Sequence, residues 1–587
     1  MKRALAGIVL VLLGGSRTAL AQPLSVETVV ARMNLQTIQN ATIITHGYQI
    51  SDSGGDSLRP LAVDIYNAIP GTGWLLDYDI VGGDNGAAMF DGNSSSGSIN
   101  LPAAGVSGQI GHLVLLFDWA PESNETSSGW TEAAGDALFA LLVALRVADP
   151  QNGTGVPMHF IGHSFGCAVN SECVERLARY GVAVDQVTYL DPHDFDQPVV
   201  PVDCEQAQFT LGAPSGYGAS VWENVLFADT YYQTRGHNGS FFPDNLVPVG
   251  RPISGAYNRF LSAPPDLPPL NSYSIFDASG DHTYVWNCFY RGTVLGSLPA
   301  GCPAPSGPLP AGYYTSTGWR FSPFAPANQQ VPQPPPVFYG ANQSHVYSNP
   351  ALVDPATGNP NASGLASLGL TADEVTAGGW SPQWNPELVA NHDFQGGFDG
   401  GQVPGWSEHG GGGGGDLVLE SGGNRYLRLS AGNANRVHNR AYIPFDALYL
   451  VFDTWRTDPS ADDLLNVRIG GTLLGAFSLT ATDVYFTTQS LGIPAEVRDT
   501  VQTITFELVP GDGVIDSIVG IDAVHFDLAV PVQIVSANPP IAAANPYEPG
   551  QPYTDVLDTG TDASVTAGIG AAGTLSQGAI QYSPIIV

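Results

Sequence analysis

The sequence predicts an α/β domain with a mostly parallel sheet, followed by an all-β domain. From residue 23 to about residue 300, short apolar runs of strand length alternate with helical segments. Near-continuous apolar strands separated by helices are typical of a parallel sheet that is covered on both faces. Between residues 385 and 528, short strands are separated by turns rich in Gly, Asp and Asn. This second pattern indicates a β-sandwich of the jelly-roll kind.

The elements of the first domain can be placed along the chain from apolar runs and helical periodicity. The expected strands are 41–45, 74–81, 112–119, a run that begins at 158, 186–190 and 225–228, and the expected helices are 57–68, 131–147, 167–180 and 283–295. Pro150 ends the second helix, because proline lacks a backbone donor and disfavours a helical residue before it. Gly181 is the expected end of the third helix.

The first 21 residues have the pattern of a signal peptide. Lys2 and Arg3 precede an apolar run at 4–15, and Ala19-Leu20-Ala21 forms a small-x-small cleavage site. An uncleaved anchor is the alternative, but this run is short for a bilayer, and we see no later apolar run of about 18 residues. We therefore expect a secreted protein, extracellular or periplasmic, with no transmembrane segment.

Composition narrows the class of protein. The 587 residues include 54 acidic and 20 basic side chains, for a net charge of −34. Such a surface repels nucleic acid and anionic lipid, so no nucleic-acid partner is expected. We attribute the acidity to a general solubility bias, although it also suits structural calcium. The 70 glycines and 46 prolines favour loops and β-turns over a helical protein.

A candidate nucleophile lies where the strand from 158 ends. The chain there reads Gly162-His163-Ser164-Phe165-Gly166, and the 167–180 helix follows at once. A G-x-S-x-G turn between a strand and a helix holds its serine exposed at the tip of a tight turn. The pentapeptide alone is weak evidence in a chain this rich in Gly and Ser, but the strand–turn–helix context favours Ser164 as a nucleophile. His163 is interpreted as a structural or hydrogen-bonding neighbour.

A serine hydroxyl needs a base, and the expected chain order is serine, acid, histidine. His282 is the best-placed base, because it opens the 283–295 helix, whereas His237 lies in a Gly/Asn turn. Asp191 follows the 186–190 strand directly and is the preferred acid. Asp229, which follows the 225–228 strand, remains the alternative. The cluster of Asp191, His193, Asp194 and Asp196 could also be interpreted as a metal site, but this is the weaker interpretation, so no metal is expected.

At these positions the stretch 42–297 resembles the pancreatic-lipase-like branch of the α/β-hydrolase superfamily. The resemblance is carried by Thr45-His46-Gly47-Tyr48, Phe117-Asp118-Trp119, Gly162 to Gly166, Tyr189-Leu190-Asp191-Pro192 and His282. It implies that Asp191, in its Leu-Asp-Pro setting, is the acid, and that the N–H groups of Tyr48 and Phe165 form the oxyanion hole. It does not extend to the family's disulfide-closed lid, because no cysteine lies between Cys204 and Cys288.

The five cysteines leave their pairing open. Cys288 and Cys302 could close a loop, and Cys204 could join Cys173 or another partner. Cys167 and Cys173 lie six residues apart on one expected helix and cannot bridge each other. The odd count leaves at least one thiol outside an intramolecular disulfide.

The rest of the chain divides by composition. Residues 301–384 are a Pro/Gly-rich wrap and linker whose aromatic residues, Trp319, Phe321, Phe324 and Tyr339, are expected to pack on the first domain. The β-domain at 385–528 resembles bacterial galactose-binding-like modules in its opening, 388–394 with Pro404-Gly405-Trp406, and in its last strand, 521–526. That resemblance implies either a glycan-binding module or a structural appendage. Residues 529–587 are expected to be a low-complexity tail.

Together these observations predict a secreted serine hydrolase of carboxylic esters, a lipase or carboxylesterase, with Ser164, Asp191 and His282 as its triad and no cofactor. Its expected partners are an ester or lipid substrate and, through the β-domain, a glycan. The alternative is a glycan-binding or adhesion protein with an inactive hydrolase domain.

Overall fold

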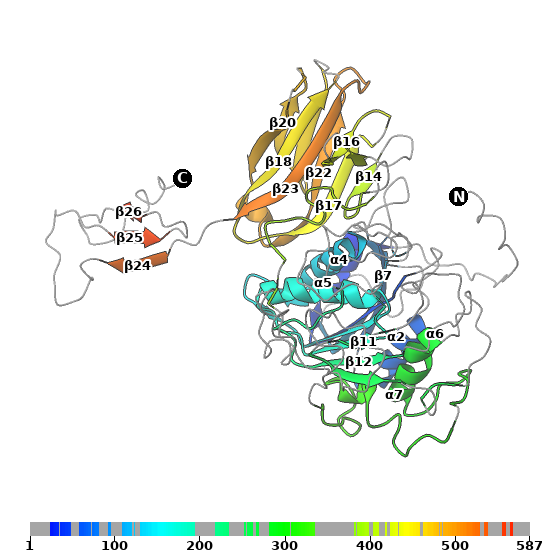
Figure 1. The fold of residues 1–587 in the computed structure, drawn as a ribbon. Helices are drawn as coiled ribbons and strands as arrows, with labels where there is room; N and C mark the ends of the chain where they lie inside the picture. The colour runs from blue at the N-terminus through cyan, green and yellow to red at the C-terminus, as the bar shows by residue number, and fades with distance from the viewer. Residues whose placement is uncertain are drawn as a thin grey trace, which may run out of the picture.

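The computed structural model has a large α/β body, a β-sandwich stacked on it and a small C-terminal sheet (Figure 1). It describes residues 24–34, 36–48, 58–71, 73–80, 92–94, 108–119, 123, 129–193, 218–233, 250, 252–253, 255–261, 266–268, 281–305, 307–334, 381–382, 384–397, 403–409, 417–419, 423–432, 434–457, 462–480, 482–483, 485–528, 533–537, 555–558 and 564–566. The expected signal peptide, His237, Cys204 and Tyr339 lie outside the described residues.

The α/β body is built on a nine-stranded sheet, which confirms the predicted class. Its order is β1 (Leu24–Ser25), β5 (Gly92–Ser94), β4 (Gly73–Ile80), β7 (His112–Asp118), β3 (Ala41–Thr45), β10 (Met158–His163), β11 (Gln186–Leu190), β12 (Ala228–Tyr232) and β13 (Tyr257–Phe260). The strands from β4 to β13 are parallel, and β5 and β1 are antiparallel at one edge. Two small ladders pair β2 (Gln36–Ile38) with β6 (Gly108–Ile110) and β8 (Ala148–Asp149) with β9 (Thr154–Gly155).

Helices cover both faces of this sheet (Figure 1). One face carries α4 (Trp130–Ala144) and α5 (Gly166–Arg179), and the other carries α2 (Arg59–Ala68), α6 (Asp281–Tyr284) and α7 (Arg291–Leu295). Alternate strand residues therefore enter two separate cores, as with Ile43 and its neighbour Ile44. A first helix, α1 (Val26–Met33), packs in the α4 and α5 core.

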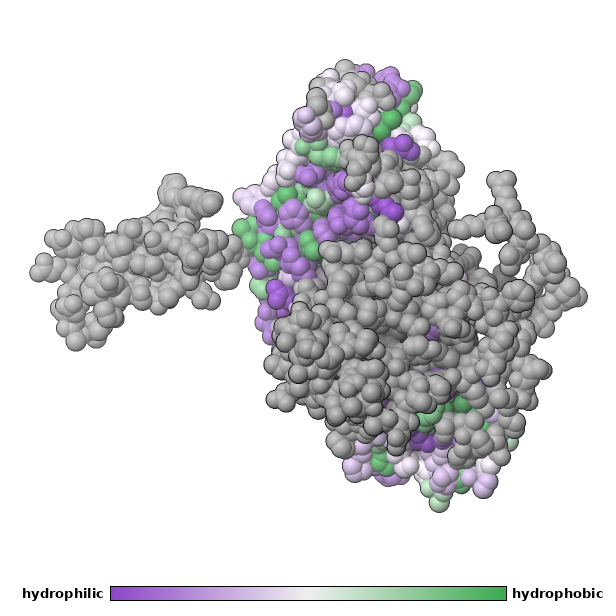
Figure 2. Space-filling view, in the orientation of Figure 1, coloured by the Kyte–Doolittle hydropathy of each residue, from purple (hydrophilic) through white to green (hydrophobic). Residues whose placement is uncertain are grey.

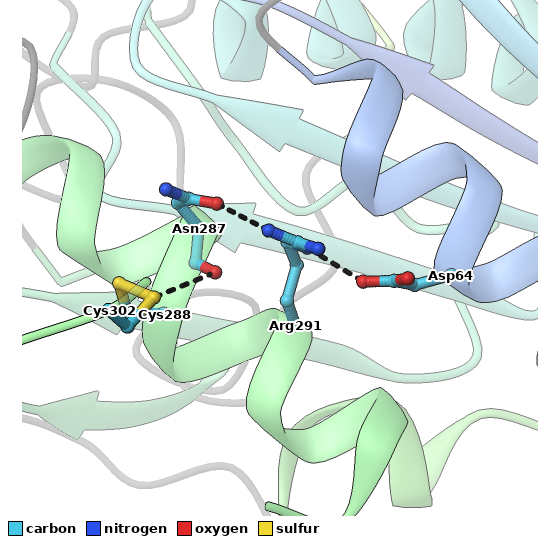
Figure 3. The surroundings of a disulfide bond; sticks show 5 residues. All are labelled: Asp64, Asn287, Cys288, Arg291 and Cys302. Carbon is cyan, nitrogen blue, oxygen red and sulfur yellow. Dashed lines mark hydrogen bonds and ion pairs between the residues drawn. A yellow bond between two sulfur atoms is a disulfide. The ribbon is translucent and has the colours of Figure 1, made fainter. Parts of the chain in front are cut away.

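The helix expected at 283–295 is one continuous helical run with a π-helical middle. It consists of α6, the π-helix η4 (Val285–Tyr290) and α7. The run is fastened by the Cys288–Cys302 disulfide and by Arg291, which donates to Asp64 on α2 at 2.7 Å and to Asn287 at 2.7 Å (Figure 3). The run begins two residues earlier than expected, so His282 lies inside its first turn. Cys167 and Cys173 are buried free thiols.

The Pro-rich segment at 307–334 packs on the α/β body. Trp319 in the short 3₁₀-helix η5 (Gly318–Phe321) stacks on His159 of β10, with ring centroids 5.6 Å apart. Phe321 meets Phe227 at 5.7 Å, and Phe324 meets His112 at 4.8 Å. These aromatic contacts hold a segment with little regular secondary structure against the α/β body.

The β-domain is an antiparallel sandwich of two five-stranded sheets around one core. One sheet has the order β14 (Ser407–His409), β17 (Arg436–Ile443), β22 (Thr500–Val509), β19 (Leu464–Ile469) and β20 (Thr472–Ser478). The other has the order β15 (Leu417–Leu419), β16 (Arg425–Leu429), β23 (Ile518–Leu528), β18 (Ala447–Thr457) and β21 (Thr487–Gly492), and η6 (Ala495–Val497) is a 3₁₀ turn. Leu473 and Tyr485 are among its exposed large hydrophobic residues. On the face drawn in Figure 2, hydrophobic and hydrophilic residues of the sandwich are interspersed, as is normal for a folded protein.

The sandwich docks on α4 and α5 through aromatic rings. Tyr442 of β17 meets Phe139 of α4 at 5.8 Å and Tyr180 at 5.6 Å, both edge-on. Beside them Arg176 lies 5.0 Å from the ring centre of Trp384, the residue that leads into the sandwich. Arg176 is fully buried, and its charge is balanced by Asp136 at 2.9 Å, Glu172 at 3.2 Å and Glu132 at 3.6 Å. The two domains are therefore held together by a contact that resembles a domain core.

One expectation about an element is wrong. The strand expected at 225–228 is instead β12, at Ala228–Tyr232. Of the expected residues, only Ala228 belongs to the continuous ladder that pairs β12 with β11 and β13. The tail at 529–587 contains three paired strands, β24 (Gln533–Ala537), β25 (Asp555–Asp558) and β26 (Ser564–Thr566). Their short apolar runs are spread too thinly to show as periodicity.

Candidate active site

Ser164 occupies a strained turn between β10 and α5. Its φ is 57°, in the left-handed region that a non-glycine residue rarely adopts. The Ser164 N–H donates to the carbonyl of Leu190 at 3.0 Å, and its carbonyl accepts from Cys167 at 3.1 Å. The turn is thus tied to the neighbouring strand on one side and to the helix on the other. This is the geometry of a nucleophile elbow.

Glycines allow the elbow to pack against the end of β3. A Cβ at Gly166 would lie 2.5 Å from the carbonyl oxygen of Thr45, and one at Gly162 would lie 2.8 Å from the Cα of Cys167. A Cβ at Gly47 would lie 2.8 Å from the Ser164 Oγ. Real Cβ atoms do not approach so closely, and for this reason only glycine fits at these three positions.

Asp191 follows β11 directly and is fully buried, with a φ of 46°. Its Oδ1 accepts the backbone N–H of Gln233 at 2.8 Å, and its Oδ2 accepts the side-chain amide of Gln233 at 2.8 Å. Its Oδ2 also lies 2.6 Å from the Nδ1 of His282. Burial raises the pKa of Asp191, while the hydrogen bonds from His282 and Gln233 oppose that rise.

The contact with Asp191 fixes the tautomer of His282. A carboxylate only accepts, so the Nδ1 of His282 carries the proton and its Nε2 keeps a lone pair. The side chain of His282 is 16% exposed, whereas that of Asp191 is fully buried. An imidazole in this state can accept a proton on Nε2.

Two further histidines surround the His282 ring. The ring centroid of His163 lies 4.5 Å away and that of His193 lies 6.0 Å away. The Nε2–H of His163 donates to the backbone carbonyl of His282 at 3.2 Å. The pKa of His163 lies well below its usual value, because burial and the nearby His282 both disfavour its charged form.

The loop after β3 carries the N–H group of Tyr48, one of the two expected oxyanion donors. The Nδ1–H of His46 donates to the carbonyl of Gly47 at 2.8 Å, and the indole N–H of Trp119 donates to the carbonyl of His46 at 2.7 Å. The Gly47 carbonyl and the Tyr48 N–H belong to one trans peptide, in which the two groups point in opposite directions. Because the carbonyl points toward the imidazole of His46, the Tyr48 N–H points away from it. Phe165, the other expected donor, is the residue immediately before α5.

Asp229 lies inside β12 rather than at the end of a strand. Its Oδ1 accepts from Thr188 at 2.6 Å and from Gln186 at 3.1 Å, and its Oδ2 accepts from Tyr231 at 2.8 Å. Burial raises its pKa to about 6. Its partners therefore come from β11 and β12, whereas His282 contacts Asp191.

Gln233 was not identified from the sequence. It is the residue that follows β12, the strand beside the one that ends at Asp191. A polar residue just after a strand adjacent to the acid strand is a usable signal. It was hidden here because the expected strand ended at 228, four residues before the observed end of β12.

Comparison with solved structures gives matches that each cover less than half of this chain. A protein assigned as a cell surface hydrolase from Lactobacillus plantarum WCFS1 is 12% identical and covers 45% of this chain and 94% of its own, with a TM-score of 0.23. A carbohydrate-binding module, CBM28, specific for non-crystalline cellulose, is 14% identical and covers 25% of this chain and 95% of its own, with a TM-score of 0.19. The K1 cleaved adhesin domain of Lys-gingipain from Porphyromonas gingivalis W83 is 12% identical and covers 21% of this chain and 83% of its own, with a TM-score of 0.15.

No protein-family model matches the chain. No curated protein matches it either. The fold class, an α/β body with a β-sandwich, therefore rests on the sheet topology described above.

The described residues also bear on metal binding and on membrane crossing. Within the ranges given above, no group of three or more His, Cys, Asp and Glu side chains is arranged to hold a metal ion. Among the same residues, none of the helices combines the length and hydrophobicity needed to cross a membrane.

Proposed function

We propose that the protein is a secreted serine hydrolase of carboxylic esters, with Ser164 as nucleophile, His282 as base and Asp191 as the acid. The observation that carries the proposal is the strained turn at Ser164 beside the 2.6 Å Asp191–His282 hydrogen bond. Ser164 is tied to Leu190, the residue before Asp191, so nucleophile and acid arise from paired strands. Export is proposed from the signal-peptide pattern at 1–21.

The proposed reaction is a two-step acyl transfer. The Nε2 of His282 takes the proton from the Ser164 hydroxyl as its oxygen attacks the ester carbonyl. Asp191 holds the imidazole in the required tautomer and stabilises the imidazolium that forms. His282 then protonates the leaving alcohol, and a water molecule, deprotonated by the same nitrogen, releases the acid from Ser164.

The N–H groups of Tyr48 and Phe165 are the proposed donors to the oxyanion. The Gly47 carbonyl is held by His46, and Phe165 opens α5, so both donors are fixed before substrate binds. Fixed donors of this kind are each worth about 3 kcal/mol of transition-state stabilisation.

Labelling with a fluorophosphonate probe tests the proposal. The wild-type protein is expected to be labelled at Ser164, and Ser164→Ala is expected to lose both labelling and ester turnover while keeping its circular dichroism spectrum. A panel of p-nitrophenyl esters from acetate to palmitate then separates a carboxylesterase from a lipase. Full turnover in Ser164→Ala would refute the nucleophile. An unlabelled wild-type protein that binds polysaccharide would favour the alternative of an inactive hydrolase domain with a glycan-binding sandwich.

A further inference from the structure

We propose that His163 is a positioning residue, which fixes the main chain of His282 relative to Ser164 and so aims the base at the nucleophile. The inference rests on the proposed function of these two residues. It assigns a role to the second position of the Gly162–Gly166 turn, which the nucleophile itself does not explain.

The imidazole of His163 packs on one face of the helical run that carries the base. Its Nε2–H donates to the His282 carbonyl at 3.2 Å, and its ring lies 4.5 Å from the His282 ring at an interplanar angle of 41°. It also meets the ring of Trp286 edge-on at 6.2 Å. His282 and Trp286 are four residues apart and therefore share this face of the helix. His163 thus contacts two successive turns as well as the backbone.

His163 lies next to all three parts of the proposed site. It is the last residue of β10, pairs with Leu190 of β11 and is bonded to Ser164. His282, in contrast, is the second residue of the four-residue helix α6, and helix ends fray. The hydrogen bond therefore links the end of a helix to two central strands. His282 is then held at two points, its ring by Asp191 and its carbonyl by His163.

A neutral donor suits this role, because an imidazolium forms on His282 during the reaction. A second cation 4.5 Å away would disfavour that charge. His163 is surrounded by His282, His46 and His193, and its burial keeps its pKa well below the usual value, so it remains neutral when His282 accepts a proton. It can therefore donate without adding charge.

Three substitutions separate a hydrogen-bonding role from packing. The amide nitrogen of glutamine reaches about as far as the Nε2 of histidine, whereas that of asparagine reaches only to the position of Nδ1. Leucine fills the buried space without donating. We expect His163→Asn and His163→Leu to lower kcat on p-nitrophenyl butyrate about 10- to 100-fold with little change in KM, since small misplacements of reacting groups cost this much. His163→Gln should recover most of the loss.

A double-mutant cycle tests whether His163 acts through the base. In a His282→Ala background, His163→Leu is expected to cause no further loss of residual turnover. Equal activities of the Gln and Asn variants, or a full further loss in the His282→Ala background, would overturn the inference. If His163→Leu fails to fold by circular dichroism, the Gln and Asn pair alone decides. Full turnover in Ser164→Ala would instead refute the proposed function itself.

Discussion

Replacing Asp191 with asparagine is expected to lower ester turnover by about 10⁴, because the variant holds the wrong tautomer of His282. Such a loss corresponds to about 5.5 kcal/mol of activation free energy. The substitution changes one oxygen to an amide group and leaves the volume of the side chain unchanged. The orientation of that amide decides the outcome, and the structure allows it to be worked out.

The two carboxylate oxygens of Asp191 have unequal partners. Oδ1 faces the backbone N–H of Gln233 at 2.8 Å, which is fixed by the strand before it. Oδ2 faces the side-chain amide of Gln233 at 2.8 Å and the Nδ1 of His282 at 2.6 Å. An amide NH₂ in place of Oδ1 would face the backbone N–H of Gln233, a donor that cannot reorient to become an acceptor. In place of Oδ2 it would face a glutamine amide that can flip and an imidazole that can change tautomer.

Asparagine is therefore expected to place its oxygen toward the Gln233 N–H and its NH₂ toward His282. The Nδ1 of His282 must then accept a hydrogen bond, so the proton of the neutral ring lies on Nε2. A protonated Nε2 cannot accept the proton of the Ser164 hydroxyl. At higher pH the loss persists, because the neutral ring keeps this tautomer.

The assay compares initial rates of purified Asp191→Asn and Asp229→Asn on p-nitrophenyl butyrate at pH 8. Asp229→Asn serves as the matched control, since it makes the same chemical change at a buried aspartate that contacts Thr188, Gln186 and Tyr231. It is expected to cost far less. A greater loss in Asp229→Asn, or near-normal turnover in Asp191→Asn, would refute both the acid assignment and the tautomer reasoning.

Two other outcomes are expected. Burial raises the pKa of Asp229 from 3.8 to about 6, so its contribution to the free energy of unfolding should fall by about 2 kcal/mol as the pH rises from 4 to 7. Chemical unfolding of the wild type and of Asp229→Asn across that range should show a stability difference that changes by this amount. A constant difference would contradict the raised pKa. Gly47→Ala should lower kcat by at least about 100-fold, because the added Cβ would collide with the side chain of Ser164. Gly307→Ala is the control: a Cβ there would have no neighbour within 4 Å among the described residues, so kcat should be unchanged. Equal rates of the two variants would show that the turn at Ser164 can shift to accommodate the new Cβ.

The sequence by itself determined the two fold classes and the turn that carries the proposed nucleophile. Both depend on local patterns: buried strands read as apolar runs, and the turn at Ser164 needs glycines within two residues on each side. The β11 strand, and hence Asp191 at its end, was predicted with its observed limits because its apolar run is continuous. The site residues it proposed stay proposals until the variants are measured.

Tertiary structure decided which groups meet. Asp191 and His282 are 91 residues apart, and their 2.6 Å contact depends on how the helical run at 281–295 packs across the sheet. The limits of β12 were set by pairing with β11 and β13, so the sequence placed Asp229 at a strand end where it does not lie. Gln233 and the donor role of His163 follow from that same packing, because a hydrogen bond between distant segments leaves no local pattern in the chain.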